Sequence, residues 1–341
     1  YAPTLEGGGN PLWIGITLGA YGATQFIMQL PFGLWSDRFG RKKIIQIGLV
    51  LLLAGSLIAA LAPNIYWMAI GRALQGAGAV SAAIMALLAD LTREEIRTRA
   101  MAIIGMSIGL TFSISLVLGP LLAQWIGLQG IFYLTAILAL LGMLATWKLI
   151  PNPMRSQFHS DASANQKLLP QVIRNGQLLR LNFGIFALHA AQMAMFIAMP
   201  AMLVSNHLPK NHHWYIYLPV VLLGFALMVP FIIYAETRHR LKPVFCGAIA
   251  LMLITQLGMV FSLHHLWLIA ALLVTYFMAF NLLEASLPSL ISKIAPAAAK
   301  GTAMGVYNAS QSLGLATGAI LGGWLYKHGQ ASAVFMFGSG L

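Results

Sequence analysis

The stretch that decides the fold is Gly33-Leu-Trp-Ser-Asp-Arg-Phe-Gly-Arg-Lys-Lys43. It is a short charged segment between two long segments without charge, residues 12–35 and 44–71. A helix needs about 20 mostly apolar residues to cross the hydrocarbon core of a bilayer, so each flank is long enough. The stretch is therefore expected to form a loop that joins two transmembrane helices on one side of a membrane.

The composition of the whole chain also indicates a membrane protein. Of its 341 residues 59% are hydrophobic and 8% are charged, whereas soluble domains carry about 25% charged residues. This excludes a cytosolic enzyme, a nucleic-acid-binding domain and a disordered chain. The single cysteine, Cys246, excludes a disulfide framework and a cysteine-based zinc site. We expect neither a metal nor a cofactor.

The same length criterion, applied along the chain, predicts ten spans and the start of another at 332–341. Two long apolar runs are each expected to contain two helices, with breaks near residues 125–130 and at His264-His265. The predicted spans lie within the uncharged or nearly uncharged runs 12–35, 44–71, 65–88, 100–147, 181–209, 211–235, 243–291 and 301–326.

Lysine and arginine alternate between rich and poor loops, which predicts the orientation of the spans. The rich loops are 36–43, 89–99, 148–180, 237–242 and 292–300, and the poor ones are 62–65, 125–130, 206–213 and 264–265. Because basic loops stay on the cytoplasmic side, these loops are expected to be cytoplasmic. The net charge of +12 is then a topology signal, and no nucleic-acid partner is implied.

An internal repeat relates the two halves of the chain. Three residues of the first half recur at one constant offset: Pro31, Asp37 and Arg41 match Pro230, Glu236 and Arg240. Residues 151–180 are polar and contain prolines and serines, as expected of a linker. We therefore expect an N-terminal transmembrane lobe at 1–150, a cytoplasmic linker at 151–180 and a C-terminal lobe at 181–341.

Equal halves require six spans each. We expect one span to precede residue 1 and the last span to be completed beyond residue 341. Two parallel six-span halves are the architecture of a two-lobed transporter with its site at the lobe interface.

Three motifs resemble those of the major facilitator superfamily. The loop matches G-x-x-x-D-R-x-G-R-[RK] through Gly33, Asp37, Arg38, Gly40 and Arg41. Residues 71–79 resemble the fourth-helix motif R-x-x-Q-G-x-G-A. A third, looser match to the fifth-helix antiporter motif rests on Gly109, Gly119 and Pro120.

The resemblance implies an all-α integral membrane fold of two six-helix lobes, without the first helix and with the last helix truncated. It further implies a monomer in the bilayer of a bacterial inner membrane, with protons and a small molecule as partners. In the family, the loop acid abuts the start of the eleventh helix, here near 301–303, and Arg41 would reach Asp90. These contacts form a conformational gate that favours the outward-open state.

The second copy of this gate is expected to be weaker. Glu236 and Arg240 repeat Asp37 and Arg41. A second match, of Ala100-Met101 with Ala303-Met304, has an offset of 203, and at this offset Lys293 takes the place that Asp90 has in the first half. Two cations would repel each other at that position.

Three ionisable residues inside predicted spans are candidates for proton coupling: Arg72, His189 and Glu284. Such residues are costly within a membrane and usually face a cavity or a partner. The alternatives are structural: an arginine held by backbone carbonyls, a packed histidine, and an acid in a permanent ion pair or hydrogen bond.

Polar side chains recur along single faces of several predicted helices. Because lipid offers no hydrogen bonds, these faces are expected to line a central cavity and contact the substrate, or alternatively to bond neighbouring helices. The candidates are Tyr21, Gln25, Gln29, Gln75, Gln192, Asn281, Tyr307, Asn308 and Gln311.

These features favour a secondary transporter that exports amphipathic, drug-like molecules in exchange for protons by alternating access. A proton symporter, a uniporter of a small organic solute and a non-transporting membrane sensor remain alternatives. A membrane enzyme is disfavoured because the chain has no Gly-x-Ser-x-Gly or His-Glu-x-x-His motif, and ATP-driven pumping because it has no phosphate-binding loop.

Overall fold

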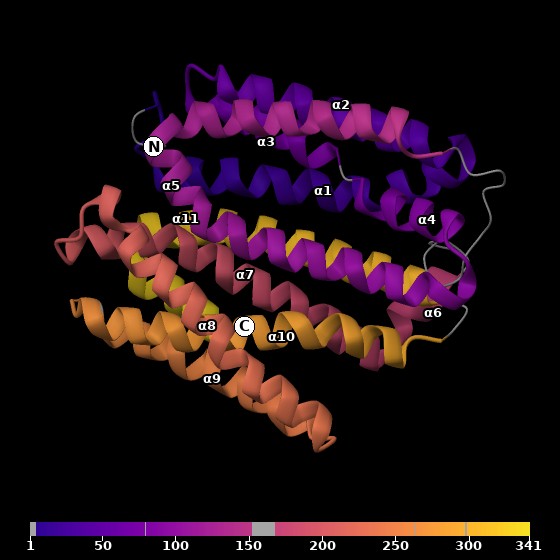
Figure 1. The fold of residues 1–341 in the computed structure, drawn as a ribbon. Coiled ribbons are helices and arrows are strands. Elements are labelled where there is room, and N and C mark those ends of the chain that lie inside the picture. The colour runs from indigo at the N-terminus through magenta and orange to yellow at the C-terminus, as the bar shows by residue number, and fades with distance from the viewer. Residues whose placement is uncertain (1–4, 79, 152–167, 263, 297–298) are drawn as a thin grey trace.

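The computed structural model describes residues 5–78, 80–151, 168–262, 264–296 and 299–341. These ranges are almost wholly helical and contain no β-sheet, only one isolated bridge between Glu6 and Asn64. The helices run roughly alongside one another, so that loops gather at the two ends of an elongated bundle (Figure 1).

The first half of the chain forms α1 (Pro11–Phe39), α2 (Arg41–Ala60), α3 (Ile65–Ala77), α4 (Ser81–Leu91) and α5 (Glu94–Lys148). The second half forms α6 (Leu169–Arg174), α7 (Gly176–Ser205), the 3₁₀ helix η3 (Lys210–His212), α8 (Trp214–Thr237), α9 (Leu241–Phe261), α10 (Leu266–Ile294) and α11 (Lys300–Gly340).

The predicted breaks occur where glycines and loop residues interrupt the apolar runs. Helix α5 is broken at Gly127 (φ 69°, ψ 178°), inside the predicted turn at 125–130. A non-helical residue, Gln330, divides α11, so its last part corresponds to the predicted start of a further span. The single span predicted at 65–88 is divided into α3 and α4. The long and nearly uncharged run did not indicate this division.

Within the described residues, seven segments are long and apolar enough to cross a membrane. They are Arg41–Ala60, Ile65–Leu91, Leu121–Lys148, Gly176–Ser205, Trp214–Thr237, Leu241–Phe261 and Leu266–Ile294. Two further long helices, α1 and α11, carry the polar stripes and many glycines and pack on each other, so they face protein more than lipid.

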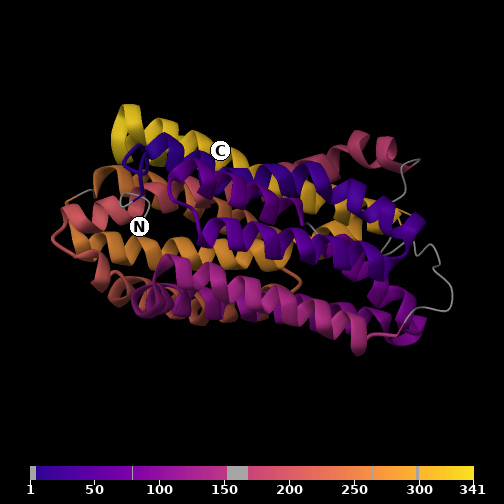
Figure 2. The ribbon, with the colours of Figure 1, turned by 90° about the horizontal axis from the view of Figure 1, so that it is seen from above.

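The helices pack in two groups that follow the two halves of the chain (Figures 1 and 2). In the first group, α3 packs on α1 and α2, and α2 packs on α5. In the second, α7 packs on α11, and α10 on α8 and α9. Helix α1 against α11 and helix α5 against α8 connect the groups. The boundaries predicted for the lobes stay a prediction.

The predicted linker 151–180 lies partly outside the described residues, which omit 152–167. Its remaining part contains α6 and the beginning of α7. Helix α7 begins at Gly176, earlier than predicted, because the side chain of Asn175 accepts hydrogen bonds from the first free backbone N–H groups.

The contact between α1 and α11 is tightest in the half of α1 away from the basic loop. A Cβ atom on Gly19 or Gly22 would lie 2.9 or 2.8 Å from a carbonyl oxygen of α11, and one on Gly15 would also collide with that helix. Nearer the basic loop, a Cβ on Gly305 would lie 3.7 Å from the side chain of Leu30, an ordinary contact. The two backbones therefore approach most closely at the poorly basic end.

Candidate functional site

A buried polar cluster lies where three helices of the second half meet. His189 comes from α7, Glu284 from α10 and Gln311 from α11. The Nε2 atom of Gln311 lies 2.9 Å from Nε2 of His189 and 3.3 Å from Oε1 of Glu284. The imidazole Nε2 is 3.8 Å from the other carboxyl oxygen, Oε2. The structure thus joins two of the predicted proton-coupling residues through a predicted cavity residue.

The hydrogen bonds define the protonation pattern of the imidazole. His189 Nδ1 lies 3.2 Å from the carbonyl oxygen of Ile185, and a carbonyl can only accept, so Nδ1 carries the proton. Nε2 is then free to accept from the amide of Gln311. The geometry therefore fits a neutral His189, with the Gln311 amide donating to Nε2 of His189 and to Oε1 of Glu284.

Further polar groups of the same helices surround this cluster. The buried side-chain atoms that have no hydrogen-bond partner among the described residues include Nε2 of Gln192, Nδ2 of Asn281 and the hydroxyl of Tyr307. The Oε2 atom of Glu284 is also without such a bond, although 35% of the Glu284 side chain is exposed, against 7% for His189. Buried polar groups are normally satisfied, so these atoms are available to a proton carrier or a substrate.

A second polar chain lies in the first half, around the predicted fourth-helix motif. Arg72 Nη1 donates to Gln75 Oε1 at 2.8 Å, and Gln75 Nε2 donates to Ser56 Oγ at 2.8 Å. The guanidinium also lies over the ring of Tyr21, 4.6 Å from its centre. Arg72, Gln75 and Tyr21, with apolar side chains such as Phe132, line a cavity of about 580 Å³.

The charged loop between α1 and α2 is organised around Arg41. Its side chain is 1% exposed, and its Nε donates to Oδ2 of Asp90 at 3.1 Å, the contact that the family resemblance implied. Nη1 donates to Ser36 Oγ at 2.8 Å, and Ser36 donates to the carbonyl of Gly33. Gly40 joins the helices with a φ of +98°, a conformation that favours glycine.

The corresponding loop of the second half has no such pair. Glu236 and Arg240 are exposed, and neither side chain has a hydrogen-bond or ion-pair partner among the described residues. Glu236 and Lys293 instead line the same hollow of about 500 Å³, together with His239. The arrangement fits the expectation that replacing the acid by Lys293 weakens the second copy.

The remaining predicted residues differ in their burial and in their partners. Gln29 is buried and bonds Ser81 of α4, so it joins two helices, the alternative to lining a cavity. Gln25 and Asn308 are half-buried. Arg38 is exposed beside the ring of Phe39. The side chains of Asp37 and Pro120 and the surroundings of Gly109 lie outside the described part. A Cβ at Gly119 would meet open space.

Sequence reasoning missed two polar residues that complete these groups. Lys42 donates to the carbonyls of Trp147 and Ile150 at the end of α5, the latter at 2.7 Å. Ser56 holds Gln75 in place. A lysine in a basic loop and a lone serine in an apolar helix give no local signal, because their partners are distant in the sequence.

Comparison with known proteins identifies the family. A sequence profile of the Major Facilitator Superfamily matches residues 5–233 and 214–341. The inner membrane transport protein YajR of Escherichia coli (strain K12) is 45% identical over 339 residues, which are 99% of this chain and 74% of YajR. The multidrug resistance protein MdtH of Proteus mirabilis (strain HI4320) is 27% identical over 336 residues, 93% of this chain and 80% of MdtH.

Solved structures show the same fold at lower identity. A bacterial homologue of the human lysosomal transporter Spinster, in an inward-facing and occupied conformation, has a TM-score of 0.73 at 15% identity, with 93% of this chain and 74% of that chain covered. The human organic anion transporter MFSD10 has a TM-score of 0.69 at 19% identity, with 96% and 81% covered. Together with the helical bundle and its loop motif, these matches establish that the chain is a multi-pass membrane transporter of the major facilitator superfamily.

Proposed function

We propose that this chain is a proton-coupled transporter that exports amphipathic, drug-like molecules by alternating access. The observation that carries the proposal is the cluster of His189, Gln311 and Glu284. It places a base and an acid 3.8 Å apart within helices that cross the membrane, where ionisable residues usually serve transport. The relatives named as multidrug resistance proteins support export of such compounds.

The cluster can hold and release one proton by a change of hydrogen bonds. With Glu284 ionised and His189 neutral, the two N–H groups of Gln311 serve both partners. A proton on Nε2 of His189 removes the acceptor there, so the amide of Gln311 has to turn or withdraw. Protonation therefore changes the position preferred by a side chain of α11.

Helix α11 can carry this change to the contact between the two helix groups. Gln311 is followed directly by Ser312, whose carbonyl oxygen would lie 2.8 Å from a Cβ on Gly22 of α1. The proton site and the tight contact thus share one helix turn. A packed contact of this kind has little freedom to deform gradually, so a shift at Gln311 favours one of two discrete arrangements.

The ion pair between Arg41 and Asp90 would act as the gate at the basic end. Both side chains are almost fully buried, so the pair anchors the loop that carries Asp37. The match of the loop to the family motif supports the same role for Gly33, Asp37, Arg38 and Gly40. Glu236 and Arg240 would contribute less, because they are exposed and unpaired among the described residues.

The chemistry of the interior favours neutral or weakly charged amphipathic substrates. The unpartnered groups near the cluster are amides and phenols, namely Gln192, Asn281 and Tyr307. In the first half, Tyr21 and Gln75 face a cavity whose walls are mostly apolar. Such walls suit compounds with a large apolar body and few polar groups.

We further propose that the chain is a monomer in a bacterial inner membrane, with its basic loops and the 151–180 linker on the cytoplasmic side. The alternation of lysine and arginine supports this orientation. Single cysteines placed at Arg240 and at His212, in a Cys246→Ser background, test it. An impermeant thiol reagent added outside intact cells should label position 212 and leave position 240 unlabelled.

Flux of a compound panel into inside-out vesicles with an imposed pH gradient tests the transport proposal. Acid inside these vesicles should drive uptake of amphipathic compounds, and collapse of the gradient should stop it. Movement of solute together with protons would favour the symporter, and movement indifferent to the gradient the uniporter. Binding without any flux would favour the membrane sensor.

A further inference from the structure

The poorly basic end of the second helix group is rich in histidine and lacks acid. Six of the nine histidines lie at this end: His207, His212, His213, His264 and His265 in its connections, and His328 in the outer part of α11. The segments 201–218, 258–270 and 320–332, which contain them, have no aspartate or glutamate. Imidazole is the side chain whose charge ordinarily changes between pH 5 and 8. This end can therefore gain positive charge in acid that no neighbouring acid compensates.

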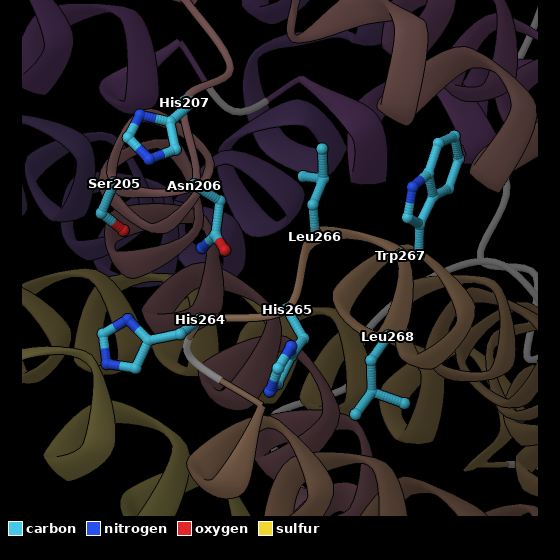
Figure 3. Close-up of a pocket in the computed structure, with 8 residues that line it drawn as sticks. All are labelled: Ser205, Asn206, His207, His264, His265, Leu266, Trp267 and Leu268. Atoms are coloured by element: carbon cyan, nitrogen blue, oxygen red, sulfur yellow. The ribbon is translucent and has the colours of Figure 1, made fainter.

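Three of these histidines line one hollow of about 620 Å³ (Figure 3). His207 follows the end of α7, whereas His264 and His265 form the connection between α9 and α10, on the facing side of the hollow. The connections are fixed by backbone hydrogen bonds, from His207 to Val204 and from His265 to Ser262. The three histidines thus lie on segments that backbone hydrogen bonds hold in place.

The other polar side chains of the hollow are already engaged. Ser205 Oγ and Asn206 Nδ2 both donate to the carbonyl of Met202. All three histidines are exposed, and no hydrogen bond or ion pair joins their side chains to the rest of the described chain. Protonated imidazoles would therefore be the principal donors that this hollow offers to a ligand.

The charged groups on the neighbouring elements are cationic or neutral. The connection from α7 to α8 contributes Lys210, His212 and His213, and the outer part of α11 contributes Lys327 and His328. Burial lowers the pKa of His213, whose ring contacts the carbonyl of Leu208. None of these groups would neutralise the hollow in acid.

The apolar side chains at the hollow place it at the level of lipid headgroups. Trp267 lines it and is 82% exposed, and Phe261, at the end of α9, is 84% exposed. Tryptophan gathers at the membrane interface, where its ring lies among the headgroups. Leu266 and Leu268 continue this surface along α10. A ligand here meets acyl chains on one side and imidazoles on the other.

We propose that this hollow is an acid-activated site for the phosphate of an anionic phospholipid, phosphatidylglycerol, in the leaflet at the poorly basic end. Histidine suits the task because further lysine or arginine at this end, beyond Lys210 and Lys327, would oppose the topology signal. The neutral histidines leave that signal intact, and acid later supplies the charge. The site responds to the pH of the compartment that the basic loops do not face.

The test measures lipid association rather than transport, so its result is independent of the export proposal. The whole chain is reconstituted in phosphatidylcholine vesicles with a trace of spin-labelled phosphatidylglycerol or, as the reference, spin-labelled phosphatidylcholine. Each cation near an anionic lipid is worth about a factor of five. Two to three charges should therefore raise the preference for phosphatidylglycerol at least about tenfold between pH 8 and pH 5.

The triple variant His207→Gln, His264→Gln and His265→Gln should lose this increase. The matched control, His212→Gln with His328→Gln, removes histidines of the same end that do not line the hollow, and it should keep most of the increase. A preference that does not depend on pH, or that both variants lose equally, would overturn the proposal. Displacement of the lipid by equimolar inorganic phosphate would assign the site to free phosphate and overturn it as well.

Discussion

Arg41 and Asp90 form an ion pair whose side chains are 1% and 0% exposed, with 3.1 Å between Nε and Oδ2. The pair joins the beginning of α2 to the end of α4, next to the charged loop. Removing one partner of a buried pair is costly because the other charge stays buried without compensation. The corresponding loop of the second half has no such pair, so the two halves should respond differently to the loss of their acids.

Asp90→Asn should therefore destabilise the end of the molecule that carries the charged loop. We expect a loss of about 3 kcal/mol in the free energy of unfolding and a several-fold larger inward-open population. Spin labels on the ends of α1 and α11 nearest the loop would report the opening, and thermal unfolding would report the stability. Glu236→Gln should do much less, and equal effects would contradict the asymmetry between the halves.

The double variant Arg41→Gln with Asp90→Asn separates the pair from its surroundings. If the two side chains stabilise the loop chiefly through each other, the double variant should be more stable than the sum of the single effects implies. Strict additivity would show that each acts through other contacts.

The glycine contact between α1 and α11 gives a second prediction. In Gly19→Ala the new Cβ would lie 2.9 Å from the carbonyl of Ala316 and 2.7 Å from Ile320, so the helices must separate. Overpacking costs about 1–3 kcal/mol, which is enough to shift an equilibrium about tenfold. Distances between labels at the poorly basic ends of both helices should lengthen.

Gly305→Ala is the matched control for this contact. It also adds one methyl group between α1 and α11, but its Cβ would lie 3.7 Å from Leu30, so the distances should stay as in the parent protein. Identical behaviour of the two variants would contradict the account of the contact.

Gly40 should be required for its backbone conformation rather than for space. At φ +98° and ψ 137° an alanine is strained, and such strain costs about 1–3 kcal/mol. Gly40→Ala should lower the unfolding temperature, although a Cβ there meets no atom. In Gly33→Ala the Cβ would lie 3.6 Å from Ala82, so stability should be retained. A larger loss at Gly33 would refute this assignment.

The sequence alone was sufficient for the order of the helices and for most of their ends. The run 100–147 is too long for one crossing, which predicted the break that the structure has at Gly127, and paired histidines predicted the connection between α9 and α10. The break between α3 and α4 was missed because the run 65–88 has the length of one crossing and, apart from Arg72, no charge. In the structure Gly78 lies against Gly48, where a Cβ would be 2.5 Å from a carbonyl oxygen, and such a tertiary contact leaves no local pattern.

The candidate site was predictable in its members but not in its connections. Helical spacing placed Gln29 on the same stripe as Tyr21, yet Gln29 bonds Ser81 whereas Tyr21 faces Arg72. Spacing specifies one face of a helix, and the partner of that face depends on packing. For the same reason His189, Glu284 and Gln311 were separate candidates in the sequence. The pairing of Arg41 with Asp90 came from the family motif.

Gln311 should couple His189 to Glu284 without being able to titrate. Gln311→Leu keeps a similar volume but removes the amide that serves both partners. We expect transport driven by a pH gradient to fall at least about tenfold, since two hydrogen bonds to a charged or polar group are lost. Gln311→Asn, which retains a shortened amide, should recover part of this rate. Full activity of the leucine variant would exclude the bridging role.

Proton movement that accompanies substrate movement tests the central claim most directly. Proteoliposomes loaded with a pH-sensitive dye are given an exported compound, and the internal pH is followed in the parent protein and in Glu284→Gln. The account predicts a substrate-dependent pH change in the parent that Glu284→Gln abolishes, while downhill exchange of the compound continues. An unchanged proton signal in Glu284→Gln, or transport by the parent with no proton signal, would contradict the account.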